Sequence, residues 1–69
     1  MYEVRWTKSA LDELAEMWLV SDSSLRDAIT AAAAQVDALL AKSPAEAGES
    51  RSDNRRILFM PPLGVSFVV

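Results

Sequence analysis

The side chains that could do chemistry in this chain are few and of limited kinds. The 69 residues include no His and no Cys, and the one Tyr stands at position 2. Classical nucleophilic catalysis needs a hydrogen-bonded general base, most often His. Zinc is held mainly by Cys and His. The composition therefore argues against a hydrolytic enzyme, and we expect no metal and no other cofactor.

Asp12, Glu13 and Glu16 form the one acidic group whose spacing could suit a metal ion or an acid–base pair. Apolar residues alternate with them at helical spacing. Such a run is far more often the solvated face of an amphipathic helix than a site. We interpret these three residues as surface charges.

Arginines are the second candidate group. The chain is acidic, with a net charge of −3 and an isoelectric point near 4.7, which argues against direct nucleic-acid binding. Three arginines nevertheless gather late in the chain, at positions 51, 55 and 56. A guanidinium can pair bidentately with carboxylate or phosphate. Arg51 fits a solvated loop charge, whereas Arg55 and Arg56 fit an anionic-partner patch and an edge-blunting strand charge equally well.

Apolar spacing predicts the elements that position these side chains. Tyr2, Val4 and Trp6 alternate with polar residues, as in a half-buried strand, whereas two later segments repeat apolar residues at helical intervals. The expected elements are a strand at 2–6, a helix at about 8–20, a helix at about 24–42, a surface loop at 43–54, a strand at 55–60, a turn at 61–64 and a strand at 65–69.

This order predicts a single α+β domain over 1–69, in which an antiparallel helical hairpin covers one face of a small, mainly antiparallel sheet. A domain of this size buries only about 60% of its unfolded surface and often needs a partner chain. The last strand, Val65 to Val69, is almost wholly apolar, so we expect it to be buried on both faces. Its unpaired edge would then be a docking site for an added strand.

Three stretches together resemble the ParE/RelE superfamily of type II toxin–antitoxin systems, also called plasmid-stabilisation proteins. "YEVRWTKSALDEL" is similar to the family's opening strand and first helix, "LRDAITAAAAQVDALLAKSP" to its second helix, and "RRILFMPPLGVSFVV" to its central hairpin. The resemblance implies a β-α-α-β-β toxin domain. It also implies that the family's last strand and tail are missing here, with a shortened chain or a partner's strand as the explanations.

The resemblance further implies a toxin that acts by binding protein and is neutralised by a small antitoxin. Gyrase poisoning is favoured over mRNA cleavage, because the arginine of the family's penultimate strand falls at or near Gly64 and the catalytic tail is absent. The alternative is a degenerate, non-toxic homologue that serves as a dimeric interaction module, paired through its sheet edge.

We expect partner binding to involve a few exposed aromatic, basic and edge-strand residues. Trp6 fits the core, whereas Trp18 ends the first helix and could contact a partner. The expected partner-binding residues are Trp18, Arg55, Arg56, Val65 and Phe67. No signal-like segment and no apolar run of about 20 residues is present, so we expect a cytoplasmic protein without membrane association.

Overall fold

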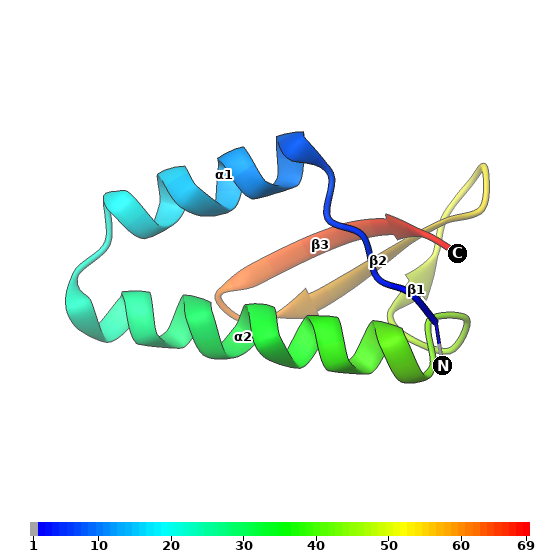
Figure 1. The fold of residues 1–69 in the computed structure, drawn as a ribbon. Coiled ribbons are helices and arrows are strands. Elements are labelled where there is room, and N and C mark those ends of the chain that lie inside the picture. Colours follow the sequence, from blue (N-terminus) through cyan, green and yellow to red (C-terminus); the bar gives the residue numbers. More distant parts are fainter. Residues whose placement is uncertain (1) are drawn as a thin grey trace.

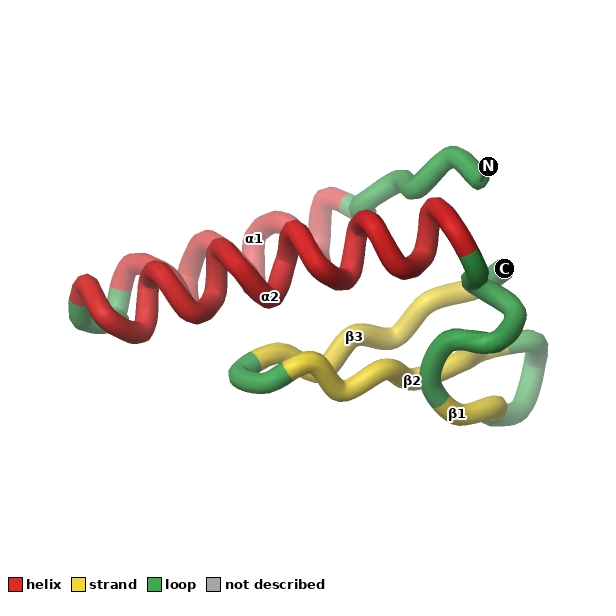
Figure 2. The backbone as a smooth tube through the Cα atoms, turned by 90° about the horizontal axis from the view of Figure 1, so that it is seen from below, coloured by secondary structure: helices red, strands yellow, loops and turns green. Residues whose placement is uncertain are grey.

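The two helices form one layer and the strands form another. The computed structural model describes residues 2–69. Figure 1 shows the helical hairpin in front of the sheet, and Figure 2 shows the two layers from the side. The elements are α1 (Lys8–Leu19), α2 (Ser23–Lys42), β1 (Glu49–Ser50), β2 (Arg55–Met60) and β3 (Leu63–Val68). The predicted α+β arrangement, with a helical hairpin on one face of an antiparallel sheet, is confirmed.

Each helix begins at a side-chain cap. The N–H of Ala10 donates to Oγ1 of Thr7 at 3.0 Å at the start of α1. The N–H of Leu25 donates to Oδ1 of Asp22 at 2.8 Å at the start of α2. Each cap satisfies one of the backbone donors that a helix start leaves without a partner. Both helices lie within one residue of their predicted bounds at each end.

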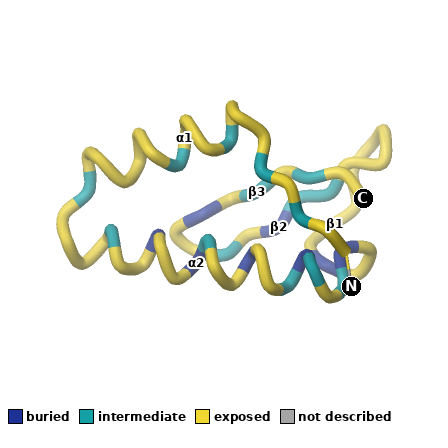
Figure 3. Tube along the Cα trace, viewed as in Figure 1, coloured by how far each residue is buried: buried dark blue, intermediate teal, exposed yellow. Residues whose placement is uncertain are grey.

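The core depends almost entirely on α2. Its buried residues, Ile29, Ala32, Val36 and Leu40, recur at intervals of three and four, so one stripe faces the sheet. No residue of α1 is buried, and Leu11 is 50% exposed. Figure 3 shows this contrast as dark segments along α2 and none along α1. The apolar stripe predicted for the first helix is therefore left largely open, because α1 packs beside α2 and not on a strand.

The strands form one antiparallel sheet in the order β1-β2-β3. Met60 pairs with Leu63 across a two-residue turn, Pro61–Pro62, whose peptide bond is cis. The bounds of β2 match the prediction, whereas β3 begins two residues earlier than expected. The predicted turn at 61–64 was therefore too long.

The prediction that the last strand is buried on both faces was wrong. Val65 and Phe67 are half-buried and face the helices, whereas Ser66 and Val68 are exposed. Val68 is 66% exposed. Helices cover only one face of the sheet, so the pleat of β3 sends alternate side chains to solvent.

The predicted strand at 2–6 was also wrong, because this segment is extended but pairs with no strand. The N–H of Tyr2 instead donates to the carbonyl of Ala41 at 2.8 Å, at the end of α2. Val4 and Trp6 pack against the core as predicted, whereas Tyr2 is exposed. We call residues 2–7 the N-terminal arm.

The segment 43–54 is more ordered than a surface loop. Ala47 is buried in the core, and β1 adds a short third strand beside β2. Gly48 has φ +67°, and a Cβ there would collide with the carbonyl of Ile57. Asp53 and Asn54 also have positive φ, which closes the tight turn into β2. The polar composition of residues 43–54 gave no indication of this short strand.

Candidate functional site

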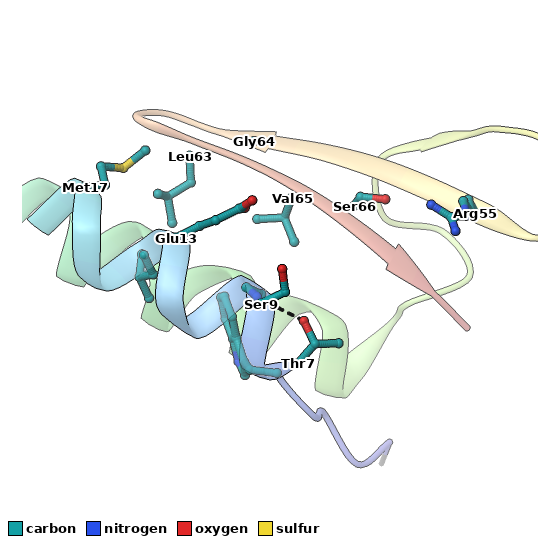
Figure 4. A pocket seen from close by; sticks show the side chains of 12 residues that line it. Thr7, Ser9, Glu13, Met17, Arg55, Leu63, Gly64, Val65 and Ser66 are labelled. Atoms are coloured by element: carbon teal, nitrogen blue, oxygen red, sulfur yellow. Dashed lines mark hydrogen bonds between the residues drawn. The ribbon is translucent and has the colours of Figure 1, made fainter.

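A continuous groove runs along β3, between that strand and the N-terminal arm with α1. Its largest hollow measures about 690 Å³ and lies between α1 and the residues Leu63 to Ser66 (Figure 4). Two smaller hollows continue it past Val4 and Phe67 toward Tyr2 and Val69. Neighbouring hollows share lining residues, so they form one channel, which we call the β3 groove.

The floor of the β3 groove is an unpaired strand edge. Among residues 2–69, β3 pairs only with β2. Because a two-residue turn closes on the Met60–Leu63 pair, the alternation of an antiparallel ladder directs the backbone of Gly64, Ser66 and Val68 to the free edge. This edge therefore offers a row of backbone donors and acceptors to an incoming strand.

The roof of the groove is one face of α1. Ala10, Glu13, Leu14 and Met17 all line the largest hollow, at helical intervals of three and four. Figure 4 shows Glu13 and Met17 turned toward β3. A strand added beside β3 would lie under this face and cover its apolar side chains. In the described residues this face of α1 contacts no strand.

Trp6 stands in the middle of the groove and lines both larger hollows. Its indole N–H donates to Oδ1 of Asp37 on α2 at 3.1 Å. The contact ties the N-terminal arm to α2. Trp6 is therefore both a core residue, as predicted, and part of the groove wall.

Two charged side chains line the largest hollow from different elements. Glu13 extends from α1, and Arg55 extends from the start of β2 and lies beside Ser66 (Figure 4). Both residues are exposed. Within residues 2–69, neither side chain forms an ion pair or a hydrogen bond, in contrast to Arg51, which pairs with Glu49 at 3.1 Å. The largest hollow thus carries one unpaired carboxylate and one unpaired guanidinium.

Three of the five predicted partner-binding residues meet in the groove. Arg55, Val65 and Phe67 line it. Arg56 points elsewhere: its Nε and Nη2 donate to the carbonyls of Ala47 and Gly48, at 2.8 and 3.1 Å. Arg56 therefore holds the loop before β1 and does not line the groove.

Trp18 lies away from the groove, at the end of α1. The guanidinium of Arg26 stacks 4.2 Å from the centroid of its ring and donates to the carbonyls of Trp18 and Leu19. Trp18 also lines a separate, almost purely apolar hollow between the two helices, together with Leu11 and Ile29. It is 40% exposed, so its side chain remains accessible there.

Sequence reasoning missed Glu13, Met17 and Ser66 as groove residues. Glu13 is exposed, as predicted for a surface charge, and it also lines the groove. The helical spacing could have placed Glu13 in the groove. It lies three residues after Ala10 and four before Met17, on the same side of the helix as these apolar residues.

Among residues 2–69, no three His, Cys, Asp or Glu side chains gather in a way that could hold a metal ion. Neither helix in that range combines the length and apolar character needed to span a bilayer. Comparisons of the chain with models of known protein families, with curated proteins and with solved structures find no match.

Proposed function

We propose that this chain is the toxin-type component of a ParE/RelE-like toxin–antitoxin module and that it acts by binding protein. The observation that carries the proposal is the β3 groove, in which an unpaired strand edge lies beneath an uncovered helix face. Main-chain pairing at a sheet edge supplies affinity, and neighbouring pockets supply specificity. A protein with a free strand edge beside such pockets can bind an extended segment of another chain.

A small antitoxin is the proposed neutralising partner. Its extended segment would pair with Gly64, Ser66 and Val68 and bury the apolar side chains of Leu14 and Met17. Such a segment would complete a sheet of four strands under the helical layer. It would also cover the surface with which the toxin binds its target. Binding of the antitoxin would in this way inhibit the toxin.

Gyrase is the proposed target, because the groove presents backbone and apolar side chains and no base–nucleophile pair. Poisoning of a topoisomerase requires binding alone, whereas mRNA cleavage requires groups that transfer protons. The charged residues of the groove are Glu3, Arg5, Glu13 and Arg55. Glu3 and Arg5 pair with each other, and neither Glu13 nor Arg55 has the His or Tyr partner on which such chemistry usually depends.

Controlled expression in a bacterial host tests this proposal. We expect the chain alone to arrest growth and induce the DNA-damage response, and we expect purified chain to accumulate gyrase–DNA cleavage complexes. Ser66→Pro removes an N–H from the free edge, where proline is tolerated because that N–H has no partner within the sheet. This variant should accumulate equally and spare growth. Ser66→Thr keeps the N–H and is the matched control.

Two results would overturn the proposal in different ways. Normal growth with the wild-type chain folded and accumulating would contradict a toxin. Growth arrest accompanied by cleavage of translated mRNA, without gyrase complexes, would contradict the binding mechanism and favour a ribonuclease.

A further inference from the structure

We infer that the segment bound by the β3 groove is a single extended strand with a basic side chain on the face turned toward α1 and an acidic side chain on the opposite face. This inference rests on the proposed uptake of an extended segment and adds the chemistry by which that segment is recognised. It starts from the two free charges of the groove, Glu13 and Arg55.

Glu13 defines the basic position. It projects from α1 toward Val65, on the helical side of the free edge (Figure 4). A strand that enters the groove displaces the water around this carboxylate. An unpaired charge in a closed site is costly, whereas a Lys or Arg opposite it satisfies the carboxylate. The bound strand therefore carries its basic residue at a position that faces the helices.

Arg55 defines the acidic position. It begins β2 and pairs with Val68, and its side chain lines both larger hollows beside Ser66. Arg55 and Ser66 are both exposed, with Ser66 on the face of the sheet that no helix covers. A guanidinium at this place fits a carboxylate of the bound strand on the same uncovered face.

The two charges approach the bound strand from opposite faces, so the sequence of that strand is constrained. Successive side chains of a strand point to opposite faces. The basic and acidic residues must therefore be separated by an odd number of positions. Adjacent placement suits the groove best, because Glu13 lies near Val65 and Arg55 lies near Ser66. The remaining positions toward α1 are apolar, to cover Leu14 and Met17.

A second copy of this chain fits these requirements poorly. Its free edge strand β3, Leu63–Val68, contains no charged residue to satisfy Glu13 or Arg55. A second copy approaching this edge would also meet α1, which lies beyond β3 (Figure 1). The other edge strand, β1, has only two residues. The groove thus fits a lone strand better than it fits the edge of a second copy.

Defined peptides test the inference on the full chain. The probes are fluorescent peptides of about eight residues, long enough to span β3, that alternate valine with threonine. One version carries Lys and Glu at adjacent positions, in either order. A second, of equal composition, carries them two positions apart, on one face. A third carries Gln in place of both. Binding is measured by fluorescence anisotropy against the wild type, Arg55→Glu, Glu13→Lys, Ser66→Pro and the control Arg51→Glu.

We expect the probe with adjacent charges to bind about five-fold more tightly than the other two. Arg55→Glu should remove this preference, and a probe with a second Lys in place of Glu should then bind best. Arg51→Glu should behave as the wild type, because Arg51 lies outside the groove and is paired with Glu49. Loss of all binding in Ser66→Pro should accompany these results.

Two different failures are distinguishable. If all probes bind alike yet Ser66→Pro abolishes binding, strand addition is right and the charge preference is wrong. If no probe binds, or if binding survives Ser66→Pro, the groove does not take up strands and the proposed binding mode fails with it.

Discussion

The indole N–H of Trp6 donates to Oδ1 of Asp37 at 3.1 Å, and this contact joins residues 31 positions apart in the sequence. It ties the N-terminal arm to α2. Together with the bond from the N–H of Tyr2 to the carbonyl of Ala41, it holds the arm that forms one wall of the groove.

A double-mutant cycle with Trp6→Phe and Asp37→Ala should reveal this contact as a coupling of about 0.5–1.5 kcal/mol in the free energy of unfolding. Urea denaturation of the four proteins provides the measurement. Gln35→Ala, an exposed change on the same helix, should have little effect. Strict additivity of the two single changes would contradict the role given to the contact.

The neighbouring arginines of β2 should separate stability from binding. Arg56→Ala removes the donors to the carbonyls of Ala47 and Gly48 and should lower the free energy of unfolding by about 1–2 kcal/mol. Arg55→Ala should change it by less than about 0.5 kcal/mol, because its side chain has no partner within the described chain. Thermal melts followed by circular dichroism decide between them; equal losses would refute the distinction.

The two glycines provide a matched pair for backbone strain. Gly48→Ala should destabilise the fold by about 1–3 kcal/mol, because φ is +67° and the new Cβ meets the carbonyl of Ile57. At Gly64 the new Cβ would lie 3.5 Å from the ring of Phe59, an ordinary contact. Gly64→Ala should therefore be close to neutral. Chemical denaturation of both variants is the check, and a reversed order would show that the loop before β1 relaxes easily.

Two valines test where the core lies. Val36 is 0% exposed, and Val20, just after α1, is 87% exposed. Val36→Ala removes two buried methyl groups and should cost about 2 kcal/mol, whereas Val20→Ala should cost less than about 0.5 kcal/mol. Guanidinium unfolding curves measure both. A similar cost at the two sites would mean that α1 and its end are covered in solution.

Much of the fold could be predicted from residue spacing. The stripe of Ile29, Ala32, Val36 and Leu40 identified α2 and its buried face, and the Pro61–Pro62 pair identified the hairpin turn. The candidate site was predicted only in part: Arg55, Val65 and Phe67 line the groove, whereas Arg56 holds a loop. The sequence does not distinguish a strand arginine that binds a partner from one that donates to a nearby backbone carbonyl.

The sequence by itself determined the local elements, because caps, helical spacing and strand alternation depend on residues a few positions apart. It could not determine what lies beside each element. Tyr2 to Trp6 has the alternation of a strand, yet its pairing depends on Asp37 and Ala41, more than thirty residues away. Only the tertiary structure decided that this segment joins α2, that α1 stays uncovered and that β3 keeps a free edge, because those outcomes depend on which distant surfaces pack together.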